Sequence, residues 1–179
     1  KQEQNEDSRV FAEFYNFSSM WADIHFALSK REQKLMVCGQ ILAFWRNSIV
    51  QEMFVLDKDL AIDWQIRKTL LFDRRLPAER KFHIDDKGNV YLLGQTYQVG
   101  LFNFQLDHKN QFVIIAYTGK GNNVNEYYIK LSGKFIRELL MESGNDNNLF
   151  CAGLYSERAR HGVSGAICFT VDNNLNKIT

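Results

Sequence analysis

The run Phe112-Val113-Ile114-Ile115-Ala116-Tyr117 is apolar almost throughout, and residues typical of turns stand on both sides of it. Asp107-His108-Lys109-Asn110 precedes it, and the loop Thr118–Asn123, with two glycines, follows it. A short apolar run between turn signals is typical of a strand that is buried on both faces. We therefore expect a central β-strand here, followed by a hairpin loop.

The residues around this run predict an antiparallel meander over residues 82–171. Asp85-Asp86-Lys87-Gly88 is a turn in which glycine supplies a positive φ, and a short strand follows at 89–93. Gly100 stands where the apolar alternation shifts its phase, which suggests a β-bulge. A short helix is expected near 133–142, because Ser132 is a candidate N-cap.

Residues 8–56 carry apolar side chains at spacings of three and four, which predicts two amphipathic helices. The stripes are Val10, Phe14, Phe17, Trp21, Ile24 and Leu28, then Leu35, Cys38, Leu42, Trp45, Ile49, Met53 and Leu56. A competing interpretation places a strand within 34–46, since Gly39 is a poor helix residue. The charged segment 72–81 around Pro77 predicts a loop between the two halves. The expected fold is one α+β domain over 1–179, with aromatic-rich N-terminal helices packed on the meander and a C-terminal hairpin.

Cys151 and Cys168 lie equally far from the centre of a loop between two apolar runs. In a symmetric hairpin they face each other, at a distance compatible with a disulfide. A disulfide would indicate an oxidising compartment. The alternative is two small buried hydrophobes, because a slip of one residue in register would separate the sulfurs. Cys38 falls in the second helical pattern and is expected to be a buried thiol.

The composition is that of an ordinary globular chain of 179 residues with a formal net charge of +1, so overall charge indicates neither a nucleic acid nor a membrane partner. Aromatic residues are numerous, with 14 Phe, 7 Tyr and 3 Trp, which favours an aromatic core or interface. No apolar run has the length of a membrane span. The chain begins at Lys1 rather than Met, which leaves open a removed N-terminal signal or anchor.

Motifs that would carry chemistry are missing from the sequence. The Gly119-Lys120-Gly121 loop lacks the pattern and the following helix of a phosphate-binding loop. The histidines show no metal-ligand spacing; they are His25, His83, His108 and His161. We predict no catalytic residues, no metal site and no cofactor, and the chain is more readily explained as a binding protein than as an enzyme.

Two groups of residues are candidate binding sites. An apolar ligand between sheet and helices would be lined by Trp64, Phe102, Phe104 and Tyr117. A basic patch would consist of Arg74, Arg75, Arg80, Lys81, Arg158 and Arg160. Core packing and a solvated loop, respectively, explain the same residues as well.

The function expected from these observations is a non-enzymatic interaction, assembly or ligand-sensing domain, placed outside the cytoplasm by the cysteine pair. Its partner would be a protein or an apolar small ligand. One alternative follows from the order of elements, a leading helix and then a meander with late cysteines, which resembles a type IV pilin-like subunit of an envelope assembly. A nucleic-acid-binding domain that uses an aromatic sheet face and Arg/Lys loops is the other alternative.

Overall fold

The computed structural model describes residues 21–43, 48–71, 75–98, 107–144, 148–158, 162–172 and 175. This part of the chain contains eleven β-strands and no helix, so no helix in it could cross a membrane. The strands are β1 (Trp21–Leu28), β2 (Lys34–Ala43), β3 (Ser48–Asp57), β4 (Ile62–Leu71), β5 (Arg75–Ile84), β6 (Val90–Gln98), β7 (Asp107–Thr118), β8 (Asn123–Ile129), β9 (Phe135–Ser143), β10 (Leu149–Ser156) and β11 (Gly165–Val171).

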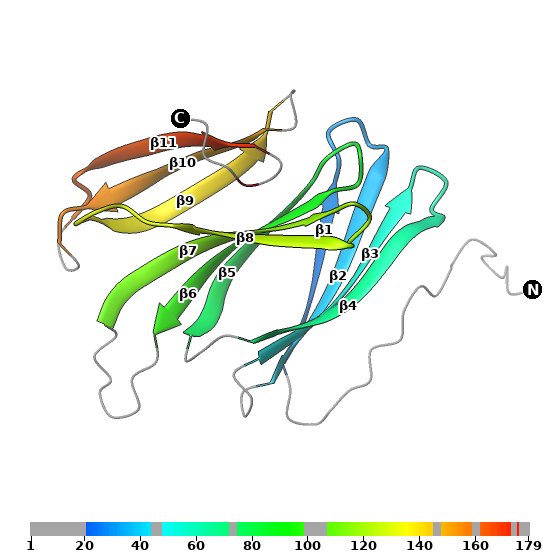
Figure 1. Cartoon of the computed structure of the whole chain (residues 1–179), viewed down its shortest axis with the longest axis horizontal. Coiled ribbons are helices and arrows are strands. Elements are labelled where there is room, and N and C mark those ends of the chain that lie inside the picture. The colour runs from blue at the N-terminus through cyan, green and yellow to red at the C-terminus, as the bar shows by residue number, and fades with distance from the viewer. Residues whose placement is uncertain are drawn as a thin grey trace, which may run out of the picture.

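Three antiparallel sheets form in chain order (Figure 1). Sheet A has the order β1-β2-β3-β4, sheet B the order β5-β6-β7-β8, and sheet C the order β9-β10-β11. Each sheet is a meander, because every strand pairs with its neighbour in sequence. The structure is therefore a repeat of one supersecondary unit, although the sequence shows no internal repeat.

Sheet B lies between the other two, and both of its faces are buried. Tyr91 and Ile114 belong to a cluster of apolar residues shared with sheet C, whereas Leu92 and Ile115 belong to a cluster shared with sheet A. Successive side chains of a strand point to opposite faces, so a strand with two buried faces is apolar at every position. The prediction that Phe112–Tyr117 is a central strand is confirmed, since β7 pairs with both β6 and β8.

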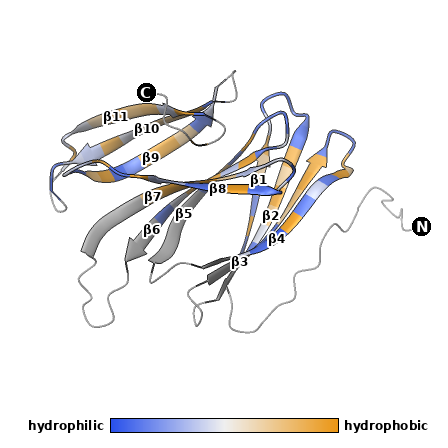
Figure 2. Cartoon of the chain, in the orientation of Figure 1, coloured by the Kyte–Doolittle hydropathy of each residue, from blue (hydrophilic) through white to orange (hydrophobic). Residues whose placement is uncertain are grey.

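The first strands of the sheets come together, since β5 contacts both β1 and β9. Hydrophobic residues occupy the strands of all three sheets, and the hairpin turns are largely hydrophilic (Figure 2). Turns of sheets A and B meet at one end of the stack, where the backbone N–H of Arg31 donates to an Asp86 carboxylate oxygen at 3.0 Å.

The predicted N-terminal helices are wrong for the described residues of that region, which form β1, β2 and β3. In β2 the reason is that the strand is apolar on both faces. Met36 and Cys38 point toward sheet B, while Val37 between them lies on the opposite face. The alternation of apolar and polar residues that marks a half-buried strand is then missing, and apolar residues at spacings of three and four arise by chance. The alternative of a strand within 34–46 is correct.

The predicted helix over 133–142 is also wrong, because β9 occupies this stretch. Leu154 pairs with Glu138 and Tyr155 with Ile136, so Arg137 is an extra residue in a β-bulge. The bulge shifts the alternation and places Ile136 and Leu139 in the same core at a spacing of three. That spacing imitates a helix.

The predicted loop around Pro77 is wrong as well, since this residue lies in β5 and pairs with Thr96. β5 stands at the end of sheet B, and proline is tolerated in such an edge strand because one side of it forms no ladder hydrogen bonds within the sheet. The Asp85–Gly88 turn is confirmed, with φ 82° at Gly88. The bulge expected at Gly100 lies outside the described residues.

Candidate interaction surfaces

The outer face of sheet A, directed away from sheet B, is apolar; its residues on β1 and Ile62 of β4 are exposed, whereas Phe54 and Leu56 of β3 are buried. We call it face A; it consists of Ile24, Phe26, Leu28, Leu35, Val37, Phe54, Leu56 and Ile62. The register aligns all of these residues except Ile24 in two adjacent rows across the sheet, because Phe26 pairs with Val37 and Leu28 with Leu35. Phe26 is 67% exposed, and Ile24 and Leu28 are more than half exposed. Contiguous apolar surface of this kind marks an interaction site.

The outer face of sheet C has the same character. We call it face C; it consists of Leu140, Phe150, Ala152, Leu154, Ala166 and Cys168. Phe150 is 52% exposed and Leu140 48%. The small side chains at its centre leave a shallow hollow of about 440 Å³. A larger side chain from a partner would fit between the flanking leucines.

The charged residues beside the two faces differ: two carboxylates lie beside face C, whereas an arginine and a glutamate face each other beside face A. Exposed Glu138 and Glu142 alternate with Leu140 on β9, next to face C. Exposed Arg67 lies next to face A, opposite the half-buried Glu52 of β3. Two copies of face C would bring four carboxylates together, whereas face A offers a guanidinium to them.

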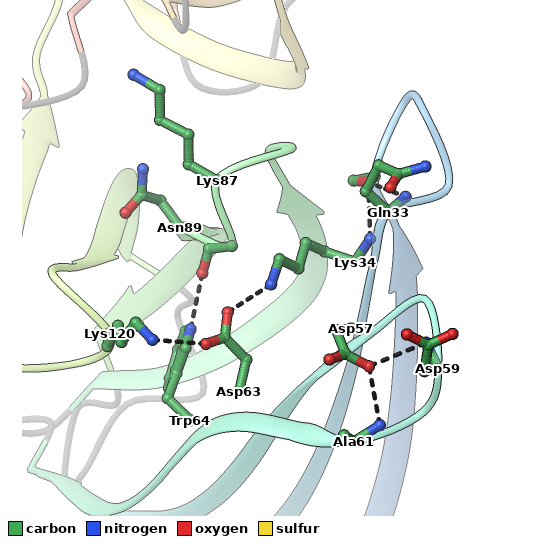
Figure 3. Close-up of polar contacts among 12 residues, drawn as sticks. Gln33, Lys34, Asp57, Asp59, Ala61, Asp63, Trp64, Lys87, Asn89 and Lys120 are labelled. Carbon is green, nitrogen blue, oxygen red and sulfur yellow. Dashed lines mark hydrogen bonds and ion pairs between the residues drawn. The ribbon is translucent and has the colours of Figure 1, made fainter.

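Trp64 holds sheets A and B together (Figure 3). Its indole Nε1–H donates to the Gly88 carbonyl at 3.0 Å, and its ring lies under Gly121 of the β7–β8 turn. Both glycines have a positive φ, and a Cβ at Gly121 would approach the ring to 3.1 Å. The two turns of sheet B can thus close over the indole only because they carry glycine there.

Asp63, the extra residue of a bulge in β4, forms the polar side of this junction. Its carboxylate accepts hydrogen bonds from Lys120 Nζ at 2.7 Å and from Lys34 Nζ at 2.5 Å. Lys120 first, and then Lys34, hold the pKa of Asp63 below its usual value of 3.8. Lys34 and Asp63 are both mostly buried, so their ion pair joins β2 to β4, and the Lys120–Asp63 ion pair joins β4 to sheet B.

A cavity of about 390 Å³ lies where the first strands meet. Its lining includes Lys30, Phe82, His83 and Glu142, which come from all three sheets. His83 Nε2 is buried without a hydrogen-bond partner. Burial lowers the pKa of His83, and the nearby Glu142 carboxylate opposes this shift. The cavity could admit a small polar molecule or water, but no group of three or more metal-ligating side chains occurs among the described residues.

The residues predicted to line an apolar ligand site lie in different settings. Trp64 and Tyr117 are buried in the core between sheets A and B, where the Tyr117 hydroxyl donates to Gln51 Oε1 at 2.5 Å. Burial therefore leaves little of either ring for a ligand. Phe102 and Phe104 fall outside the described residues.

The residues of the predicted basic patch are spread over two sheets. Lys81 is exposed on β5, and Arg158 is exposed after the end of β10. The backbone of β5 also places Arg75 and Arg80 in sheet B. Arg74 and Arg160 lie outside the described residues.

The predicted disulfide between Cys151 and Cys168 does not form. Cys151 pairs with Phe169 and Cys168 with Ala152, so the register differs by one residue from the symmetric one. The slip puts the two side chains on opposite faces. Cys151 is buried toward sheet B, where burial raises the pKa of its thiol to about 12, whereas Cys168 is exposed on face C.

Sequence reasoning missed both faces. Ile24, Phe26 and Leu28 alternate at a period of two, which is the signal of a strand, but Ile24 and Leu28 were assigned to a helical stripe. No family model matches the sequence, and no similar protein was found among curated proteins or solved structures.

Proposed function

We propose that the protein is a non-enzymatic assembly module that associates with further copies of itself, face A of one copy packing against face C of the next. The observation that carries the proposal is where the exposed apolar side chains gather: Ile24, Phe26 and Leu28 on face A, and Leu140, Phe150 and Leu154 on face C. Both faces of sheet B are buried by sheet packing within the chain. The proposed contact repeats this packing between copies.

The carboxylates of Glu138 and Glu142 would repel those of a second face C, whereas Arg67 beside face A can pair with them, which favours an A-to-C contact over a contact between two copies of face C. Such a head-to-tail contact is heterologous, so it closes into a ring or continues as an open array. Consecutive antiparallel four-stranded sheets stacked face to face are also how the blades of a β-propeller are arranged. This likeness concerns architecture alone and says nothing of a ligand.

The other expectations have less support. The pilin-like layout relied on leading helices, and the described part of that region is sheet. An extracytoplasmic location relied on the disulfide, which is absent. For nucleic-acid binding, Tyr127 packs against the core, so Tyr128, which is 45% exposed, is the one of these two neighbouring tyrosines whose ring a base could reach.

The test is sedimentation of the wild type and of one variant in each face. We expect the wild type to associate as its concentration rises. Phe26→Glu breaks face A and Phe150→Glu breaks face C, so each variant alone should remain monomeric. Mixed together, they should form a dimer and nothing larger, because one intact face A meets one intact face C.

Val163→Glu is the matched control, since Val163 is 58% exposed in the loop before β11 and belongs to neither face. It should associate like the wild type. A wild type that stays monomeric at every concentration would refute the proposal. Association of Phe26→Glu alone would replace it with a contact between two copies of face C.

A further inference from the structure

The cavity of about 390 Å³ between the first strands of the three sheets is separate from the hollow of face C, with which it shares no lining residue. Its lining comes from β1 and the turn after it, from the end of β5 and from the end of β9. Its volume lies within the range of about 300–1,000 Å³ that is usual for small-molecule sites.

His83 brings a buried polar atom to this cavity. Successive residues of β5 point to opposite faces, so Phe82 packs toward sheet A, while the His83 ring stacks with Tyr91 on the side of sheet C. His83 Nε2 is buried and has no hydrogen-bond partner among the described residues. Because buried polar atoms normally have a partner, this one indicates that a polar group binds in the cavity.

The surroundings of His83 favour an ammonium group as that partner. Burial lowers the pKa of His83, so its ring is neutral at neutral pH. A neutral imidazole carries its proton on one nitrogen and a lone pair on the other. With the proton on Nδ1, Nε2 is an acceptor near the Glu142 carboxylate, and an ammonium group can donate to both.

Lys30 adds a positive charge to the lining, from an exposed position in the turn between β1 and β2. A ligand with only a positive charge would be repelled by Lys30, and a ligand with only a negative charge would be repelled by Glu142. A zwitterion matches both charges. Phe26, Leu28 and Phe82 give the same cavity apolar surface for the rest of such a molecule.

We propose that this cavity binds a small zwitterion of the α-amino acid class with an apolar side chain. Its ammonium group donates to His83 Nε2 and Glu142, and its carboxylate pairs with Lys30. Its side chain packs on the apolar part of the lining. The site lies within one copy of the chain, so it requires no association between faces.

Equilibrium dialysis against labelled L-leucine tests the proposal, at a protein concentration where sedimentation shows monomers. Isopentylamine, which is leucine without its carboxylate, should compete about fivefold more weakly than leucine, because it does not pair with Lys30. Isocaproate, which is leucine without its ammonium group, should compete at least about tenfold more weakly, because it loses both acceptors. Absence of saturable leucine binding up to about 10 mM, or equal competition by either analogue, would overturn the proposal.

Substitutions of exposed residues test where the ligand lies. Lys30→Gln should weaken leucine binding about fivefold without weakening that of isopentylamine, whereas Glu142→Gln should weaken both. Glu138→Gln is the matched control, since Glu138 is exposed on the same strand and does not line the cavity. It should leave leucine binding unchanged. An equal loss in Glu138→Gln and Glu142→Gln would overturn the assignment of the site.

Discussion

Gly121→Ala should destabilise the protein through a contact that Gly133→Ala does not make. Both glycines have a similar positive φ, 78° and 69°. A Cβ at Gly133 meets nothing within 4 Å, whereas at Gly121 it would lie 3.1 Å from two atoms of the Trp64 ring. Alanine in the left-handed region costs about 1–2 kcal/mol, and the smaller entropy of its unfolded chain returns about 0.4–1 kcal/mol. Gly133→Ala should therefore lower the free energy of unfolding by about 1 kcal/mol.

Gly121→Ala carries the same backbone cost and, in addition, overpacks the indole. Overpacking in a core costs about 1–3 kcal/mol, so the total should be about 2–4 kcal/mol. Urea unfolding followed by circular dichroism measures both variants. In a Trp64→Phe background, which lacks the two ring atoms, the cost of Gly121→Ala should fall to that of Gly133→Ala. Equal costs of the two glycine substitutions in the wild-type background would refute the packing of sheet B turns on Trp64.

Two further predictions concern titratable groups. The lysine partners of Asp63 lower its pKa in the folded protein, so Asp63→Asn should lower the free energy of unfolding by about 2 kcal/mol at neutral pH. Urea unfolding measured at decreasing pH should show this difference between wild type and variant disappear below pH 3.8, where the carboxylate becomes protonated. A difference that stays constant down to acid pH would contradict the ion pair with Lys34. In the Phe26→Glu variant, which is expected to be monomeric, a thiol reagent should label Cys168 quickly in the folded state and Cys38 and Cys151 only after unfolding, as mass spectrometry would show; fast labelling of Cys151 would contradict the register of β10 and β11.

The back half of the fold was predictable where turn chemistry and burial agree. Asp85–Gly88 contains the aspartate and the glycine that its turn requires, and Asp85 Oδ1 accepts the N–H groups of Lys87 and Asn89 at 2.9 Å. The run Phe112–Tyr117 is apolar at every position, as a strand with two buried faces should be. These signals are local, so a single sequence is enough to find them.

Bulges and registers were not predictable, because they depend on the partner strand. Arg137 is an extra residue in β9, where its guanidinium donates to Ser156 Oγ at 2.8 Å on the neighbouring strand. The sequence of residues 133–142 does not by itself predict this extra residue. The pairing of Cys151 with Phe169 rather than Cys168 likewise depends on the loop between β10 and β11. One residue of slip decided between a disulfide and two separate thiols.

The error in the N-terminal half and the proposed function have the same physical origin. A sheet that covers a core on one side and meets water on the other alternates apolar and polar residues, and its pattern is easily recognised. β2 does not alternate in this way, because Leu35 and Val37 are apolar on the side away from sheet B, as Met36 and Cys38 are on the side toward it. An outer face intended for solvent would not need Phe26. The loss of alternation in sheet A is therefore the sequence signal that agrees with the proposed association, in which another copy covers this face.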